Sequence, residues 1–291
     1  MFEGVYPALI TPFEDTADAG LNLPGLRANI EYLIENGVHG VVPCGSTGES
    51  ATLTFEEHEI VIGETIDVVN GRVPVVAGTG SNNTAEALRF TKSAYDQGAD
   101  AVLVLSPYYN KPNRSGLIKH YTKIADVGVP LIVYNVPSRT GQNLSADLIT
   151  ELAAHPNIIG VKEASGDITQ ISEIIEATRD EEFSVFSGDD AMTLPVLALG
   201  GAGVITVTAN VEPTRFVALF ERFRAGDYAG AQEMHYELSP LMRALFIDTN
   251  PIPVKRAVGM RGMAAGPLRL PLDCMTGAAE AQLKEVLSRY D

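Results

Sequence analysis

Short runs of apolar, often β-branched residues recur along the chain, and amphipathic stretches separate them. Almost every position within a run is apolar, which is typical of parallel strands that are covered on both faces. Eight runs are therefore predicted to be strands: residues 6–11, 40–44, 73–78, 101–105, 130–134, 158–162, 183–187 and 203–207. Their first residues lie 20 to 34 positions apart, about the length of one strand and one helix.

The stretches between these runs have the periodicity of helices. Residues 24–36 stop at Gly37 and residues 84–97 stop at Gly98, and glycine is the usual residue just after a helix. Eight strand-and-helix units predict an α/β fold, a (β/α)8 TIM barrel over residues 1–211. A doubly wound sheet is the alternative, although it seldom needs eight units without a dinucleotide-binding fingerprint. Residues 212–291 show only helical patterns and are predicted to form a helical extension packed on the barrel.

Composition narrows the class of protein. Of the 291 residues, 45% are hydrophobic, which is enough for one large core. The formal net charge of −16 argues against nucleic acid or an anionic membrane as a partner. Two cysteines are too few for a disulfide scaffold. Because no stretch reads as a signal peptide or a membrane span, a cytoplasmic protein is predicted.

Lys162 directly follows the apolar run at residues 158–161, at the strand end where barrel enzymes carry their chemistry. Burying an ammonium is costly, so the position calls for an explanation. The lysine either reaches solvent or pairs with Glu163, or it has a lowered pKa and attacks a carbonyl to form a Schiff base. The barrel interior provides the necessary desolvation, which favours the Schiff-base lysine.

Other strand ends offer groups that fit such chemistry. Tyr134 ends the preceding strand, so its phenol can reach the same substrate carbon as Lys162 and carry protons. The segment GSTGE, residues 45–49, is predicted to turn sharply into a helix, with backbone N–H groups and hydroxyls that suit a carboxylate.

Motifs for other chemistries are incomplete. Residues 44–48 lack the first glycine of a nucleophile elbow, and residues 78–83 lack the third glycine of a dinucleotide loop. His58 has no second histidine at zinc-protease spacing. Asp189 and Asp190 are predicted to cap the helix that follows rather than to hold a metal. Neither a metal nor a cofactor is predicted.

Several segments occur together in one order: GSTGE, PYYN, YNVPSRTG, GVKEAS and GVITVTAN, with SGDD and NPIPVKRA. With them the chain resembles, over its whole length, the dihydrodipicolinate synthase/N-acetylneuraminate lyase family of class I aldolases. The synthase branch of that family condenses pyruvate with L-aspartate 4-semialdehyde at the start of the diaminopimelate route to lysine. The resemblance implies this reaction, and it implies a homo-oligomer, a tetramer built as a dimer of dimers.

The resemblance also implies a role for individual residues. Lys162 would form the Schiff base with pyruvate, and Tyr134 would donate and accept protons. Ser46 would be the relay hydroxyl, and Tyr109, lent by a neighbouring subunit, the relay tyrosine. The residues expected to bind substrate are Gly45, Thr47 and the backbone of Ile205 for pyruvate, and Arg139 for the carboxylate of the semialdehyde.

Two alternatives stay open at this point. The first is an aldolase of the same family for N-acetylneuraminate or a 2-keto-3-deoxy sugar acid. Ser46-Thr47 stands where the synthase usually has two threonines, and a Ser-Thr pair also occurs in the lyase branch, whereas the arginine of PSRTG is a synthase feature. The second, more distant alternative is a non-catalytic barrel that binds a keto acid.

Lysine-inhibited members of the family have an allosteric pocket at a subunit interface. The matching positions in this sequence are Ser50, Ala51, His58, Asn82, Glu86 and Tyr108. Phe55 replaces the histidine of one inhibited type. Inhibition by lysine is therefore a hypothesis of the resemblance.

Overall fold

A parallel β-sheet forms the centre of the protein in the computed structural model, which describes residues 2–291. The strands are β1 (Gly4–Pro7), β2 (Val76–Gly78), β3 (Ala101–Leu105), β4 (Leu131–Asn135), β5 (Ile158–Glu163), β6 (Ser184–Ser187) and β7 (Gly203–Thr206). Their order is β1-β7-β6-β5-β4-β3-β2, and every neighbouring pair is parallel.

Isolated bridges close this sheet into a barrel. Val42 pairs with Ala8 beyond β1, and Val41 pairs with Val75 beside β2. The strand predicted at residues 40–44 is thus reduced to two bridging residues. Pro43 has no N–H to continue the ladder, and Cys44 has a left-handed φ of 57°, so the extended run stops there. The predicted barrel architecture is confirmed.

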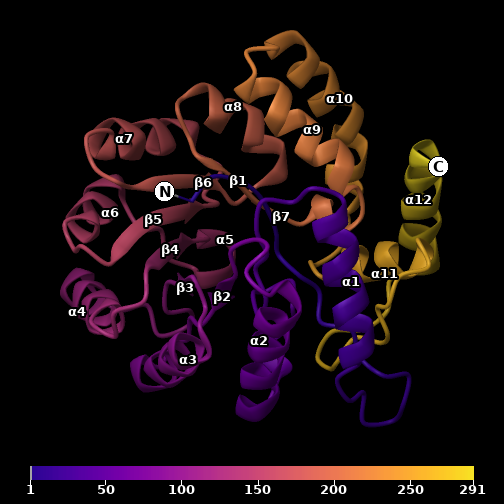
Figure 1. Ribbon diagram of the computed structural model, residues 1–291, viewed down its shortest axis with the longest axis horizontal. Coiled ribbons are helices and arrows are strands. Elements are labelled where there is room, and N and C mark those ends of the chain that lie inside the picture. The colour runs from indigo at the N-terminus through magenta and orange to yellow at the C-terminus, as the bar shows by residue number, and fades with distance from the viewer. Residues whose placement is uncertain (1) are drawn as a thin grey trace.

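Helices surround the strands, as Figure 1 shows. The ring consists of α1 (Leu23–Glu35), α2 (Phe55–Val69), α3 (Thr84–Gln97), α4 (Arg114–Ala125), α6 (Ala146–Ala153), α7 (Ile168–Thr178), α8 (Thr193–Ala198) and α9 (Pro213–Arg224). A one-turn helix, α5 (Pro137–Thr140), follows β4. Three further helices lie outside the ring: α10 (Tyr228–Ala244), α11 (Ile252–Met260) and α12 (Gly277–Leu287).

Local sequence signals explain several element ends. The side chain of Asn83 caps the first turn of α3, and Gly98 ends that helix with a left-handed φ of 90°. Thr54 and Glu57 form a reciprocal capping box at the start of α2. The predicted bounds of α1 and α3 agree with the structure to within one residue. The first predicted strand, residues 6–11, began and ended too late, because β1 covers residues 4–7. The third, residues 73–78, was too long, because only residues 76–78 form β2.

Apolar side chains fill both sides of the strands. One cluster fills the barrel interior: Tyr6, Ala8, Val42, Val76, Ala101, Leu103, Ile132, Tyr134, Val136, Phe186 and Ile205. A larger cluster lies between the strands and the helices α1 to α8, and a third joins β1 and β7 to α9 through α12. The near-continuous apolar runs in the sequence follow from this two-sided burial. The division of the chain at residue 211 stays a prediction.

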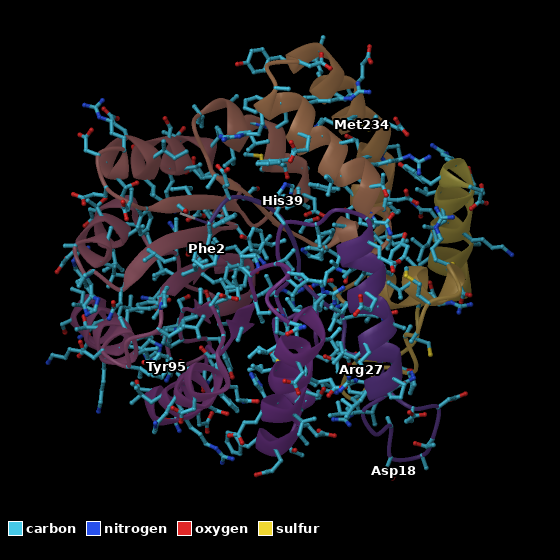
Figure 2. All side chains as sticks on the ribbon, in the orientation of Figure 1. Phe2, Asp18, Arg27, His39, Tyr95 and Met234 are labelled. Carbon is cyan, nitrogen blue, oxygen red and sulfur yellow. The ribbon has the colours of Figure 1, made fainter. Side chains whose placement is uncertain are left out.

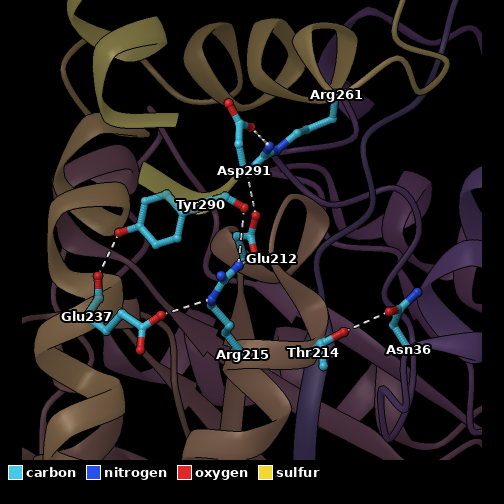
Figure 3. Close-up of polar contacts among 8 residues, drawn as sticks. All are labelled: Asn36, Glu212, Thr214, Arg215, Glu237, Arg261, Tyr290 and Asp291. Carbon is cyan, nitrogen blue, oxygen red and sulfur yellow. Dashed lines mark hydrogen bonds and ion pairs between the residues drawn. The ribbon is translucent and has the colours of Figure 1, made fainter. Parts of the chain in front are cut away.

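Ion pairs join the start of α9 to the C-terminal residues (Figure 3). The carboxylate of Glu212 accepts hydrogen bonds from Arg215 at 2.5 Å and from Arg261 at 2.6 Å. The hydroxyl of Tyr290 donates to the backbone oxygen of Glu237 at 2.6 Å. These contacts fix α10, α11 and the chain end against the last helix of the ring.

The outer surface carries both charged and large apolar side chains. Figure 2 shows Asp18 at the far end of the loop between β1 and α1, and Tyr95 on α3 is 51% exposed. Within residues 2–291, no helix combines the length and the hydropathy that a membrane span requires.

Candidate active site

Lys162 and Tyr134 lie side by side at the carboxyl end of the barrel. They are register partners on β5 and β4. The Nζ atom of Lys162 lies 4.3 Å from the centre of the Tyr134 ring. Only 6% of the lysine and 8% of the tyrosine is exposed. A side chain at Gly188 would approach the lysine, since a Cβ atom there would lie 3.1 Å from its Cε. The two residues singled out from the sequence therefore do meet.

Burial weakens the proton affinity of the Lys162 amine. Desolvation lowers its pKa from 10.5 to about 8. The negative charge of Asp190 partly opposes this shift, and the positive charge of Arg139 adds to it. An amine with a pKa near 8 is partly neutral at physiological pH, which is the state that attacks a carbonyl.

The phenol of Tyr134 is shifted in the opposite sense. Burial raises its pKa to about 12, while the positive charge of Arg139 opposes this shift and the negative charge of Glu163 adds to it. The phenol is therefore protonated at neutral pH and can donate a proton to an oxygen atom held next to Lys162.

Asp189 and Asp190 were both predicted to be helix caps, but their carboxylates have different hydrogen-bond partners. Asp189 does accept a hydrogen bond from the N–H of Ala191 at the start of a short 3-10 turn. Asp190 is 2% exposed, and its carboxylate accepts from the N–H groups of Val207 and Thr208, at 3.3 and 2.7 Å. The prediction was wrong for Asp190, because its partners lie at the end of β7, 17 and 18 residues away.

The segment 45–49 forms a tight loop rather than the start of a helix. A 3-10 turn, Ser50–Thr52, follows it, and α2 begins only at Phe55, so the predicted sharp entry into a helix is wrong. The N–H groups of Gly48 and Glu49 bond back to the loop itself. Within residues 2–291, the N–H groups at positions 45 to 47 make no hydrogen bond, unlike those of Gly48 and Glu49.

A cavity of about 590 Å³ opens at this end of the barrel. Its walls include Gly45, Ser46, Tyr134 and Arg139 from the predicted catalytic and substrate-binding set. They also include five of the six predicted lysine-site residues, namely Ser50, Ala51, His58, Glu86 and Tyr108. Part of the predicted catalytic set thus shares one space with most of the predicted lysine site, but Lys162, Thr47 and Ile205 are not among the lining residues. The sixth residue, Asn82, donates a hydrogen bond to the backbone oxygen of Tyr108 at 3.2 Å.

The remaining predicted residues differ in exposure. Thr47 is 3% exposed, and Ile205 in β7 is 1% exposed, with Tyr6 as its register partner. Arg139 lies in α5 on the rim, where its Nη2 donates to the backbone oxygen of Asn250 at 2.9 Å. Tyr109 is 90% exposed and is not part of the cavity wall. Within one chain, the structure does not bring Tyr109 to Lys162.

Asn250 also lines the cavity, although its sequence context did not predict this. Its side chain donates to the hydroxyl of Thr47 at 3.1 Å, and its backbone oxygen holds Arg139. NPIPVKRA contributed to the resemblance, but nothing in its spacing indicated that its asparagine reaches the cavity. Among residues 2–291, no group of three or more His, Cys, Asp or Glu side chains is arranged to hold a metal ion.

A partly neutral lysine amine beside a protonated phenol, inside a (β/α)8 barrel, is the arrangement of a class I aldolase, which bonds its carbonyl substrate covalently. Residues 1–290 match the model of the Dihydrodipicolinate synthetase family, and the chain belongs to that family.

Similar proteins agree with this classification. A 4-hydroxy-tetrahydrodipicolinate synthase from Methanoculleus marisnigri is 70% identical over 290 residues, which cover 100% of each chain. A chloride-inhibited dihydrodipicolinate synthase from Acinetobacter baumannii, solved in complex with pyruvate, has 40% identity and a TM-score of 0.96, covering 99% of both chains. A structure described as the first monomeric dihydrodipicolinate synthase variant also has 40% identity and a TM-score of 0.96, over 99% of this chain and 96% of that one.

The lowered pKa of Lys162 has a consequence for stability. In the window between about 8 and 10.5, the unfolded chain binds more protons at this lysine than the folded protein does. The folded protein therefore gains stability from this residue as the pH rises through the window. Below pH 8 the full cost of the buried charge is present.

Lys162→Met should accordingly be more stable than the parent at pH 7, because methionine fills the space without a charge. We expect this advantage to shrink by roughly 2–4 kcal/mol between pH 7 and 10.5. Urea unfolding of both proteins at one fixed protein concentration measures it. All other groups titrate in both proteins, so a difference that is constant with pH would contradict the lowered pKa.

Proposed function

We propose that this chain catalyses the reaction of a 4-hydroxy-tetrahydrodipicolinate synthase, the condensation of pyruvate with L-aspartate 4-semialdehyde. The observation that carries the proposal is the buried amine of Lys162, with a pKa near 8, against the ring of Tyr134. The full-length identity of 70% to a synthase supports the same reaction. A cytoplasmic location is part of the proposal.

The first half of the reaction would use the interior residues. The carboxylate of pyruvate binds the free N–H groups at positions 45 to 47 and the hydroxyl of Thr47. The neutral amine of Lys162 attacks the keto carbon, and one proton passes from the nitrogen to the oxygen to give a carbinolamine. The phenol of Tyr134 then protonates this hydroxyl, which leaves as water. The resulting iminium ion withdraws electrons from the neighbouring methyl group. When the methyl group loses a proton, the iminium ion becomes an enamine. Ser46 and Tyr109 would relay these protons together with Tyr134.

The second half would use the rim. The enamine carbon attacks the aldehyde of the semialdehyde and forms the new carbon–carbon bond. The amine of that substrate then displaces Lys162 from the iminium carbon, which closes the ring and frees the enzyme. Arg139 binds the carboxylate of the semialdehyde, since a guanidinium can grip a carboxylate with two parallel hydrogen bonds.

The exposure of Tyr109 supports a shared active site. A tyrosine that is 90% exposed, with a left-handed φ of 71°, presents a large ring away from its own chain. We propose that it enters the cavity of a second copy, in a tight dimer that pairs into a tetramer. The monomeric relative means that this assembly has to be measured for each member of the family.

Control by lysine is a further part of the proposal. The carboxylate of Glu86 accepts a hydrogen bond from Ser81 at 2.8 Å and borders the same cavity as the catalytic groups, where it could receive an ammonium group. His58 stacks on Phe90 and bonds to the backbone oxygen of Gly78 at 2.8 Å, so its role in such a site would be to form the wall. Activity that does not change in millimolar lysine would remove this hypothesis.

The other aldolase reactions of the family are the second candidate function. The adjacent residues Ser46 and Thr47 favour it, as in the lyase branch. A long polyol substrate, however, needs neutral hydrogen-bonding groups, whereas the rim of this cavity carries the cation of Arg139. A barrel that only binds a keto acid would not need the lowered pKa of Lys162.

Borohydride reduction in the presence of pyruvate should add the mass of the reduced pyruvyl group at Lys162. Lys123→Ala, which removes an exposed lysine in the last turn of α4, should keep the adduct, and Lys162→Ala should lose it. A coupled assay should detect condensation with aspartate semialdehyde and no cleavage of N-acetylneuraminate or 2-keto-3-deoxygluconate. A parent protein without the adduct would favour the non-catalytic barrel.

Arg139→Ala should raise the KM for aspartate semialdehyde by roughly 10- to 100-fold, the loss expected for hydrogen bonds to a charged group. The KM for pyruvate should change much less, because pyruvate binds deeper in the barrel. Arg139→Lys keeps the positive charge but cannot form two parallel hydrogen bonds. Its KM for aspartate semialdehyde should therefore lie between those of the parent and of Arg139→Ala. Steady-state kinetics in both substrates give the answer, and equal increases in the two KM values would count against this role.

Mixing two inactive variants tests the shared site. Tyr109→Phe and Lys162→Ala should each have little activity alone. After subunit exchange at equal amounts, half of the dimers are mixed and each mixed dimer has one intact site, so about a quarter of the parent activity should return. Activity no higher than the sum of the two separate variants would show that Tyr109 acts within its own chain or not at all.

A further inference from the structure

A second lysine amine is buried close to the active site. Lys255, in α11, places its Nζ 2.5 Å from Oε1 of Glu49, and the two side chains are 2% and 0% exposed. The same Nζ lies 3.9 Å from the centre of the Phe13 ring. A sealed ion pair has a large desolvation cost, and apolar residues of similar volume often give equal or greater stability. Stability alone therefore does not explain the pair.

The ion pair contacts a loop, residues 45–49, whose backbone conformation is unfavourable at both ends. Glu49 is the last residue of the loop 45–49 and has a left-handed φ of 54°, while Cys44, just before the loop, has a φ of 57°. Left-handed backbone is unfavourable for residues with a Cβ, and it persists where the surroundings enforce it. Both ends of the loop that carries Ser46 and Thr47 are thus in conformations that require outside support.

The hydroxyl of Thr11 donates to the backbone oxygen of Gly48 at 2.7 Å. Three further contacts come from one distant segment, residues 250–269. Lys255 holds one carboxylate oxygen of Glu49, and the N–H of Arg269 donates to the other at 3.0 Å. Asn250 donates to the hydroxyl of Thr47 at 3.1 Å. Three contacts from this segment therefore fix the loop at its end and in its middle.

We propose that the Glu49–Lys255 pair, with Asn250, is a positioning clamp for the pyruvate-binding loop. It holds the free N–H groups at positions 45 to 47 and the Thr47 hydroxyl in the geometry that receives the carboxylate of a small 2-keto acid. The clamp residues do not touch the reacting carbon. This inference rests on the proposed function, because it assigns the loop to pyruvate.

Four variants separate positioning from stability. Lys255→Met leaves an unpaired buried carboxylate, and the double variant Glu49→Gln, Lys255→Met removes both charges. Asn250→Ala removes only the side-chain contact to Thr47. The matched control is Arg256→Met, at the next position of α11, which breaks an exposed ion pair with Glu280. Each variant is measured as the full-length protein in its native assembly.

Two readouts are compared for each variant. The first is the melting temperature. The second is the pyruvate concentration that gives half-maximal borohydride trapping at Lys162 without semialdehyde. Lys255→Met should lower the melting temperature and raise this concentration roughly 10- to 100-fold, the penalty typical of misplaced binding groups. The double variant should regain most of the melting temperature, because no unpaired charge remains, while the pyruvate requirement stays raised.

The remaining arms complete the test. Asn250→Ala should raise the pyruvate requirement with a smaller loss of melting temperature, and Arg256→Met should change neither readout. If Lys255→Met does not fold, the double variant and Asn250→Ala decide the question. The clamp is overturned if both of them bind pyruvate as the parent does. Absence of an adduct in the parent itself would overturn the proposed function, and the clamp with it.

Discussion

The desolvation of one amine sets the requirements for the rest of this structure. A lysine at the end of a parallel strand loses its water only if the strands close around it and helices cover their outer face. Two bridges at Val41 and Val42 complete that closure. The pKa near 8 is then a balance, because Asp190 partly restores the proton affinity that burial removes. A carboxylate in direct contact would occupy the amine, and a site with no negative charge nearby would do nothing to stabilise its charged form.

Lys162 and Lys255 are both buried and both have a lowered pKa, but their immediate surroundings differ. Burial lowers the pKa of Lys255 to about 8, as it does for Lys162. Lys255, however, is in contact with the carboxylate of Glu49, so its amine is occupied. The neighbour of Lys162 is an aromatic ring, which accommodates a cation without binding the nitrogen lone pair. A lowered pKa therefore identifies a nucleophile only together with the absence of a direct partner, and within the described residues Lys162 meets both conditions.

The sequence predicted what local physics determines. Apolar runs, and glycines just after helices, predicted the barrel and most of its strands. Burial on both faces of a strand and left-handed helix ends each produce a sequence pattern within a few residues. The run at residues 40–44 was overestimated since hydropathy does not register the missing N–H of Pro43. Lys162 was found because a charge after an apolar run is unusual. The contacts of Asp190, Asn250 and Lys255 were not predicted, because their partners lie far along the chain. The separations are 17 and 18 residues for Asp190, 203 for Asn250 and 206 for Lys255.

These long-range contacts also show which parts of the chain position the residues around the cavity. The interior strands supply groups whose positions are fixed by register, such as Lys162 opposite Tyr134. The loop 45–49 has no such register, because the extended segment before it is only two bridging residues, Val41 and Val42. A loop after so short a strand must be positioned by other contacts. Thr11 bonds to the backbone oxygen of Gly48, and the segment 250–269 contacts Thr47 and Glu49. The segment between α10 and α11 is then part of the cavity wall, since Asn250 lines the cavity and contacts both Thr47 and Arg139.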